Sequence, residues 1–104
     1  MAETLNTETF APFLKEHPVV LADFYKDGCV ACRRIAPLLA RVESAQAGQT
    51  ALARVNTSSN LALAQQYEIE ATPTLILFRD GLEVSRHRGV ITKDELYKFL
   101  EEAL

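Results

Sequence analysis

The chain has 104 residues, enough for a single domain over residues 1–104 that buries a core without the support of a disulfide. Its apolar fraction of 48% and charged fraction of 24% are typical of a soluble globular protein. A formal net charge of −3 argues against binding to nucleic acid or to an anionic membrane surface. No stretch resembles a transmembrane span or a signal peptide. We therefore expect a cytoplasmic protein, and a monomer, since no coiled-coil pattern or apolar stripe is visible.

The first half of the chain alternates helical and extended patterns. Residues 19–25 form a short apolar run, rich in β-branched and aromatic residues, which is typical of a strand buried on both faces. Pro18 ends the helix before this strand, and Gly48 ends the helix after it. Helices are expected over about residues 7–17 (capped by Asn6 or Thr7), 29–47 and 61–67, and strands over 19–25 and 50–56.

The second half predicts a hairpin and a final helix. Asp80-Gly81 favours a two-residue turn between strands over 73–79 and 82–88. Thr92-Lys-Asp-Glu95 has the form of a capping box, so a last helix is expected after it. Strands separated by helices run parallel, whereas hairpin strands run antiparallel. The sequence thus predicts an α/β fold with a central mixed sheet of four or five strands, flanked by about four helices.

The only two cysteines, Cys29 and Cys32, lie where the apolar strand gives way to a helix. A Cys-x-x-Cys pair at the start of a helix can close a small disulfide and leave its first sulfur exposed. The helix N-terminus supplies unpaired N–H groups and the positive end of the macrodipole, which favour a thiolate over a thiol. This arrangement indicates that Cys29 attacks a disulfide and that Cys32 resolves the mixed disulfide.

Other uses of the cysteine pair stay open at this point. In a cytoplasmic protein a lone close pair is more typical of catalysis or metal binding than of a structural disulfide. Two cysteines supply half of a tetrahedral site, so zinc or an iron–sulfur cluster would need a second chain with its own pair. We expect no metal and no cofactor in a single chain.

Four blocks of sequence, covering nearly the whole chain, resemble the thioredoxin family. They are Ala22-Asp-Phe-Tyr25, then Cys29-Val-Ala-Cys-Arg-Arg-Ile-Ala-Pro37, then Ala71-Thr-Pro-Thr-Leu75, and last Phe78-Arg-Asp-Gly81 with Arg88-Gly-Val90. A Cys-x-x-Cys motif alone is a weak signal, whereas the four blocks in this order are a strong one. The resemblance implies a thioredoxin fold and thiol-disulfide chemistry, with Cys29 as nucleophile and Cys32 as the resolving cysteine.

The resemblance also implies roles for residues around the pair. Asp23 corresponds to a buried acid that helps to move a proton on or off the resolving cysteine, rather than to a surface acid at a strand end. A buried carboxyl has a raised pKa and can exchange protons near neutrality. Pro73 corresponds to a cis-proline beside the active site. The implied substrate-binding residues are Gly28, Val30, Thr72, Pro73, Arg88 and Gly89, and the supporting residues are Tyr25, Pro37 and Arg54.

The chain departs from the family pattern near the cysteines. Gly28-Cys-Val-Ala-Cys32 stands where thioredoxins typically carry Trp-Cys-Gly-Pro-Cys, and the chain contains no tryptophan. The residues between the cysteines help to set the reduction potential. Arg54 takes the place of a lysine, and its permanent charge is expected to hold Asp23 ionised more firmly if the two are close. Arg88 replaces an apolar residue at the rim of the expected groove, which favours acidic partners.

The leading functional hypothesis is an enzyme that reduces protein disulfides, with a thioredoxin-reductase-like electron donor and disulfide-containing proteins as substrates. The Val30-Ala31 dipeptide leaves an oxidant or isomerase as an alternative. A non-catalytic binding module with the same fold is a further alternative, since a fold does not fix a function. The presence of both cysteines disfavours that last hypothesis.

Overall fold

The computed structural model describes residues 2–104. Within this range the helices are α1 (Phe10–Glu16), α2 (Val30–Ala45), α3 (Leu61–Gln66) and α4 (Lys93–Glu101). The strands are β1 (Glu3–Leu5), β2 (Val19–Tyr25), β3 (Ala51–Asn56), β4 (Thr74–Arg79) and β5 (Leu82–Arg88). The predicted order of elements is confirmed from the first helix onward.

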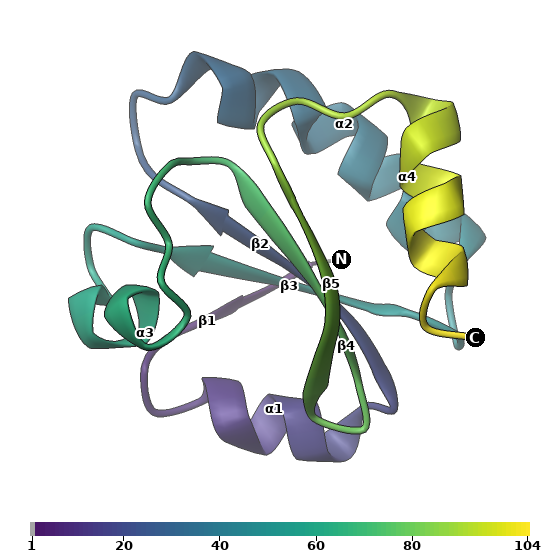
Figure 1. The fold of residues 1–104 in the computed structure, drawn as a ribbon, viewed down its shortest axis with the longest axis horizontal. Coiled ribbons are helices and arrows are strands. Elements are labelled where there is room, and N and C mark those ends of the chain that lie inside the picture. The colour runs from purple at the N-terminus through teal and green to yellow at the C-terminus, as the bar shows by residue number, and fades with distance from the viewer. Residues whose placement is uncertain (1) are drawn as a thin grey trace.

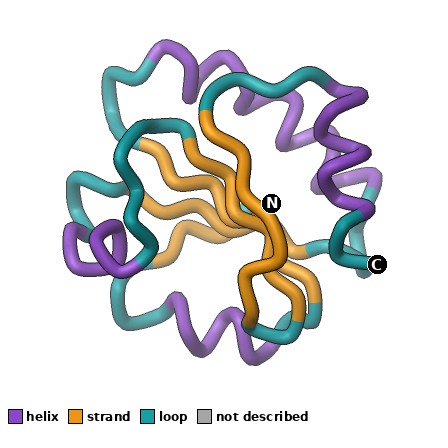
Figure 2. The backbone as a smooth tube through the Cα atoms, in the orientation of Figure 1, coloured by secondary structure: helices purple, strands orange, loops and turns teal. Residues whose placement is uncertain are grey.

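The five strands form one mixed sheet in the order β1-β3-β2-β4-β5. β1 and β2 run parallel to β3, whereas β4 is antiparallel to both β2 and β5. Figure 1 shows α1 and α3 on one side of the sheet and α2 and α4 on the other. In Figure 2 the strands form a twisted layer between these helices. The mixed α/β architecture expected from the sequence is therefore confirmed.

Alternation along the central strand β2 divides the apolar core in two. Ala22 and Phe24 face the cluster that also holds the buried side chains of α1 and α3. Leu21 faces the opposite cluster, with the buried side chains of α2 and α4. Asp23 has the same parity as Leu21 and so points toward the α2 side of the sheet. The only acid of this strand is therefore placed beneath the helix that carries the cysteines.

The N-terminal region differs from the sequence-based prediction in two ways. β1 was not predicted, because a three-residue strand with one buried side chain, Leu5, has too short a pattern to detect. Its order comes from pairing with distant β3, where Leu5 lies opposite Val55. The first helix begins at Phe10 rather than near residue 7, because Asn6 Oδ1 accepts the backbone N–H groups of residues 8 and 9 in a preceding turn.

Local signals in the second half of the chain predicted its structure correctly. Asp80 and Gly81 adopt positive φ angles of 51° and 82° in the turn between β4 and β5. These angles suit the two-residue turns that follow the twist of a hairpin. Thr92 and Glu95 form the predicted capping box at the start of α4. Turn and cap chemistry act over four residues, so they can be read without knowledge of the tertiary fold.

Three loops meet at one end of the sheet. Phe24, near the end of β2, pairs with Thr74 at the start of β4, and Thr74 pairs with Arg88 at the end of β5. The segment after β2 leads into α2, and the segment before β4 contains Pro73. Chain topology thus brings the cysteine motif, the proline segment and the end of β5 together.

Candidate active site

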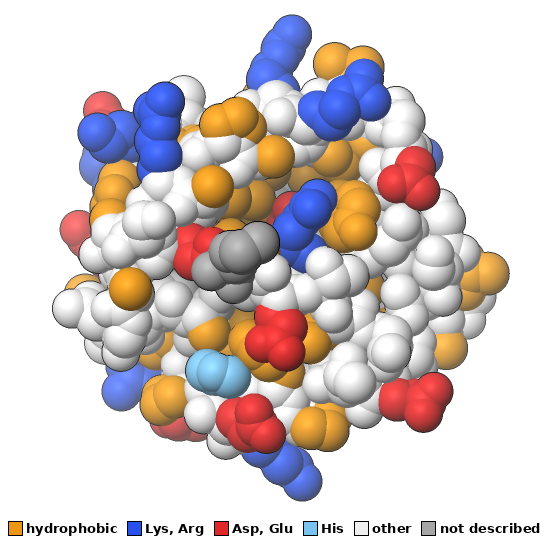
Figure 3. Space-filling view, turned by 180° about the vertical axis from the view of Figure 1, so that it is seen from behind, with side chains coloured by type: hydrophobic (Ala, Val, Ile, Leu, Met, Phe, Trp, Pro, Cys, Tyr) orange, Lys and Arg blue, Asp and Glu red, His pale blue; other side chains and the backbone are white. Residues whose placement is uncertain are grey.

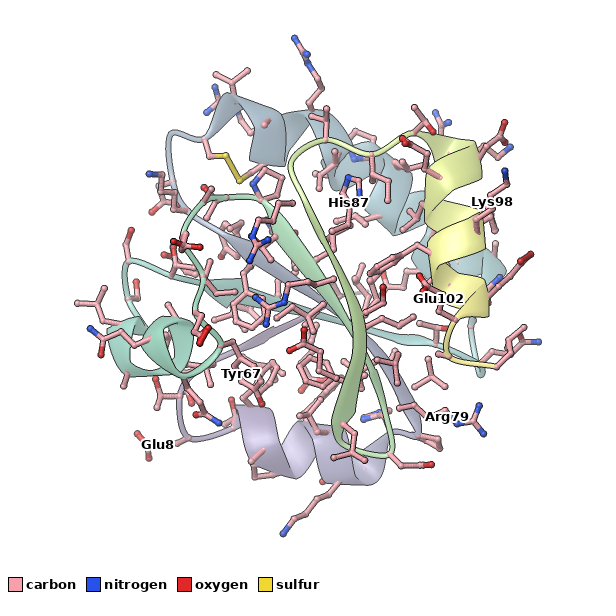
Figure 4. All side chains as sticks on the ribbon, in the orientation of Figure 1. Glu8, Tyr67, Arg79, His87, Lys98 and Glu102 are labelled. Carbon is pink, nitrogen blue, oxygen red and sulfur yellow. A yellow bond between two sulfur atoms is a disulfide. The ribbon has the colours of Figure 1, made fainter. Side chains whose placement is uncertain are left out.

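The cysteines form a disulfide at the first turn of α2, with Cα atoms 5.2 Å apart. Figure 4 shows this bond where the loop after β2 enters the helix. Cys29 is the N-cap residue, and the backbone N–H of Cys32 donates to Cys29 Sγ at 3.1 Å. Cys32 is 4% exposed, whereas Cys29 is half-buried. A thiolate on Cys29 would therefore be both the more accessible sulfur and the one stabilised by a helix N-terminal donor.

The proline segment lies against the first sulfur. The Thr72–Pro73 peptide bond is cis, as the family resemblance implied, and Pro73 is buried. Cys29 Sγ lies 3.6 Å from the carbonyl oxygen of Thr72. The backbone N–H of Gly89 donates to the carbonyl oxygen of Pro73 at 2.8 Å. These contacts bring residues 72, 73 and 89 together next to Cys29.

Asp23 is a buried acid with an incomplete set of partners. It is 1% exposed, which rules out a surface acid at a strand end. Arg54 lies opposite it in the β2–β3 register, and Arg54 Nε donates to Asp23 Oδ2 at 3.3 Å. Oδ1 of Asp23 is buried without a hydrogen-bond partner among the described residues. The guanidinium of Arg54 also lies over the Tyr25 ring, 3.9 Å from its centroid.

Burial raises the pKa of Asp23 above its ordinary value of 3.8, and the charge and hydrogen bond of Arg54 oppose this rise. The predicted proximity of Arg54 is confirmed, and Arg54 favours the ionised form of Asp23 as expected, but the net shift of the pKa is upward, as expected for a buried carboxyl. The reason is that loss of hydration around a deeply buried carboxylate outweighs one partly solvated ion pair. A carboxyl with a raised pKa is able to hold and release a proton closer to neutrality.

Replacing Arg54 with methionine is expected to raise the pKa of Asp23 further, because the variant loses both influences that lower it. The measurement is an NMR titration of the Asp23 carboxyl carbon in the oxidised protein. Arg34→Met is the matched control, since it removes the same charge from an exposed position of α2. An Asp23 pKa that is the same in the Arg54→Met variant and in the parent would contradict the inferred coupling.

A cleft of about 400 Å³ opens beside Cys32. Its lining comes from the end of β2, the following loop, the first turns of α2 and the side chain of Arg54. The residues are Tyr25, Lys26, Asp27, Gly28, Cys32, Arg33, Ala36 and Arg54. The predicted supporting residues Tyr25 and Arg54 thus share one wall with Cys32. The sequence analysis did not predict that Lys26 and Ala36 line this cleft. Their only signal in the sequence is that they lie near the Cys-x-x-Cys motif.

The chain is similar to known proteins over nearly its full length. The family model described as Thioredoxin matches residues 1–102. The chain belongs to the thioredoxin family. It is 34% identical over 102 residues to a thioredoxin of Chlamydia caviae, with 98% of each chain covered. It is 36% identical over 102 residues to a thioredoxin-like protein of Synechocystis, with 97% of each chain covered.

Two further thioredoxin relatives bear on fold and partnership. A mutant thioredoxin from Halobacterium salinarum has a solved structure that superposes with a TM-score of 0.89 at 31% identity, covering 98% of this chain and 89% of that one. A bifunctional thioredoxin reductase/thioredoxin of Mycobacterium leprae is 30% identical over 102 residues, which are 98% of this chain and 22% of that protein. The thioredoxin fold is therefore confirmed. Together with the Cys29–Cys32 pair, family membership makes this chain a thiol-disulfide oxidoreductase.

The structure gathers most of the thioredoxin site residues predicted from the sequence, but not all. Val30 is 62% exposed next to the disulfide, and Gly28 is exposed at the lip of the cleft. Arg88 is exposed and precedes Gly89, so it lies at the rim of the proline segment. Pro37 lies further along α2, on its exposed surface, and the helix continues through it. Pro37 is therefore a feature of the helix and does not line the site.

The remaining surface of this thioredoxin is of mixed character. Figure 3 shows acidic, basic and apolar side chains interspersed on the face behind that of Figure 1. No continuous basic face is visible from that side. None of the helices in residues 2–104 is long and apolar enough to cross a membrane.

Proposed function

We propose that this protein reduces disulfides in other proteins, with Cys29 as nucleophile, Cys32 as resolving cysteine and Asp23 as the acid that exchanges a proton with Cys32. The single observation that supports these roles best is the difference between the two sulfurs. Cys29 is half-buried and its Sγ accepts a hydrogen bond from a backbone N–H of the helix terminus, whereas Cys32 is almost fully buried. An accessible thiolate attacks another protein, and a buried one reacts within its own chain.

The cycle is balanced in two exchange steps. In the reduced protein the Cys29 thiolate attacks one substrate sulfur, the substrate S–S bond breaks, and the second substrate sulfur leaves as a thiolate that takes up a proton. The Cys32 thiolate then attacks Cys29 Sγ, and the first substrate sulfur leaves and is protonated. Two electrons and two protons pass to the substrate, and the Cys29–Cys32 disulfide remains.

The buried acid supports the second step. Cys32 must lose its proton before it attacks, and Asp23 lies on the side of the sheet that α2 covers. A carboxylate whose pKa is raised by burial can accept that proton near neutrality. Asp23 Oδ1 has no hydrogen-bond partner among the described residues, so one oxygen is free to take it.

The groove for the substrate is proposed to comprise Gly28, Val30, Thr72, Pro73, Arg88 and Gly89. The Thr72 carbonyl lies 3.6 Å from Cys29 Sγ, so an extended segment paired with that backbone would bring its own sulfur to the nucleophile. Val30, next to Cys29, is 62% exposed, and Val90, next to Gly89, is 49% exposed, so both offer apolar contact at the proposed groove. Arg88 adds positive charge at the rim and favours acidic segments.

Thioredoxins work with thioredoxin reductase, and the relative from Mycobacterium leprae is named as a bifunctional thioredoxin reductase and thioredoxin. We propose a reductase of that class as the electron donor, disulfide-containing proteins as substrates, one domain over residues 1–104, a monomeric state and a cytoplasmic location. The oxidant or isomerase alternative rests on the Val30-Ala31 dipeptide, since the residues between the cysteines shift the balance between dithiol and disulfide.

The proposal is tested in a coupled assay that contains NADPH, a thioredoxin reductase, this protein and a protein disulfide substrate. NADPH oxidation that requires both this protein and the substrate is the expected result. The reductase is omitted in one control and the substrate in another. Absence of turnover, while a dithiol still reduces Cys29–Cys32, would contradict the proposed direction and favour the oxidant or isomerase.

A further inference from the structure

The side chains that line the cleft beside Cys32 carry a net positive charge. Three of its lining side chains are cationic, Lys26, Arg33 and Arg54, and one is acidic, Asp27. The protein as a whole is acidic, with a formal net charge of −3. Cys32 and Gly28 belong to the same lining, so any group held in the cleft lies next to the reacting disulfide. The local charge is therefore opposite in sign to the overall charge, at the place where substrates meet the protein.

The cations of the cleft have unused hydrogen-bond donors. Arg54 is fixed by its Nε contact with Asp23 and by its place over the Tyr25 ring. Its Nη groups have no hydrogen-bond partner among the described residues, and the same holds for the side chains of Lys26 and Arg33 within residues 2–104. A guanidinium held in one orientation loses little side-chain entropy when it binds an oxygen ligand. Arg54 is thus oriented to bind an anion, and the exposed side chains of Lys26 and Arg33 add positive charge around it.

We propose that this cleft binds a carboxylate that the substrate carries close to its disulfide. The inference rests on the proposed function and adds a substrate class, namely acidic segments that flank a reducible cysteine. A carboxylate matches the fork of donors on an arginine, and in a partly enclosed cleft its attraction to the cations is less screened than in open solvent. Asp27 opposes such a ligand by repulsion, so its removal should strengthen binding.

The positive charge of the cleft is separate from the positive charge that Arg88 provides. Arg88 lies on β5 near the proline segment and is not part of the cleft lining. The cationic side chains of the cleft lining come instead from the loop after β2, the first turns of α2 and Arg54 of β3. A substrate segment that crosses the disulfide therefore meets positive charge both at the cleft and at Arg88.

Arg33 and Arg34 provide a matched pair of variants. Both are exposed arginines in the first turns of α2, but only Arg33 lines the cleft. Arg33→Gln and Arg34→Gln change the net charge equally. The probe is a short peptide in which S-methylcysteine is flanked by glutamates, compared with the same peptide flanked by glutamines. Binding to the oxidised protein is followed through the backbone amide NMR signals of Gly28, Cys32 and Arg33 or its replacement.

The glutamate peptide is expected to bind the parent protein about threefold or more tightly than the glutamine peptide, as for a well-placed charge pair. This preference should be lost in Arg33→Gln, kept in Arg34→Gln and increased in Asp27→Asn. The increase cannot come from loss of folding. No preference in the parent protein would overturn the proposal, because the carboxylate would then not be recognised. An equal loss in both arginine variants would also overturn it, because the preference would then depend on the net charge of the protein and not on the cleft.

A free carboxylate separates two sources of the ligand. If N-acetylglutamate shifts the same amide signals in an Arg33-dependent way, the cleft recognises the carboxylate alone, including that of small molecules. If only the peptide does so, the carboxylate is recognised as part of a protein segment. Both results support the cleft. Because these probes have no disulfide, the measurement stays valid even if the coupled reductase assay fails.

Discussion

Cys32→Ser is expected to accumulate a covalent mixed disulfide with the substrate protein, whereas Cys29→Ser forms none. In the first variant Cys29 still attacks, but no second sulfur displaces the substrate. In the second, the nucleophile itself is missing, and the remaining sulfur is only 4% exposed. Turnover of protein disulfides should fall by roughly a thousandfold or more in both, as for loss of a covalent nucleophile or its partner.

The two cysteine variants are controls for each other. Each lacks the Cys29–Cys32 disulfide, so any loss of stability from the missing bond is shared. The products are separated on non-reducing gels and identified by mass. A mixed disulfide on Cys32 in the Cys29→Ser variant, with none in the other, would reverse the assignment of nucleophile and resolving cysteine.

Asp23→Asn is expected to stabilise the oxidised protein near neutral pH, because it removes the desolvation penalty of a buried carboxylate; the gain should not exceed the roughly 1–4 kcal/mol found when whole buried ion pairs are replaced by uncharged residues. Asparagine keeps the shape of the carboxyl without its charge. Arg54 loses its partner in this variant, but its side chain is 33% exposed, so water can solvate the guanidinium. Urea unfolding of the oxidised protein measures the difference.

The pH dependence of the Asp23→Asn difference follows from the raised pKa. The folded protein holds the Asp23 proton to a higher pH than the unfolded chain, whose carboxyl titrates near 3.8. Stability of the parent protein therefore falls as pH rises from 3.8 through the raised folded-state pKa, and stays lowered above it. Asp23→Asn removes this loss, so its advantage should shrink as pH falls to 3.8.

The matched control for Asp23→Asn is Asp27→Asn, which changes the same charge on an exposed loop residue. This control should alter the free energy of unfolding by less than about 0.5 kcal/mol, as for most surface substitutions. An Asp23→Asn variant that is no more stable than the parent near neutrality would show that Arg54 fully compensates the buried carboxylate.

Local chemistry explains which parts of the fold were predictable. The β4–β5 hairpin and the start of α4 depend on Asp80, Gly81, Thr92 and Glu95, whose effects reach only a few residues. β1 depends instead on pairing with β3 from the middle of the chain, and three residues carry no period of their own. The N-terminal residues alone therefore do not predict β1, because they carry no signal of its pairing with β3.

The same distinction holds at the active site. The spacing of Cys29 and Cys32 at a helix start favoured disulfide exchange but left metal binding open, and family resemblance supported disulfide exchange and added Asp23 and the cis-proline. The balance between burial and Arg54 was not predictable, because it depends on how completely the α2 side of the sheet excludes water from Asp23. The cleft was missed for a similar reason, since Arg54 on β3 joins Arg33 only through the fold.

The most direct test of the central claim is a redox titration of Cys29–Cys32 against defined dithiol and glutathione buffers, read by alkylation and mass. The proposed reductant should equilibrate only with the strongly reducing dithiol buffer and stay largely oxidised in glutathione. Ready reduction by glutathione would contradict that direction and identify the protein as an oxidant or isomerase.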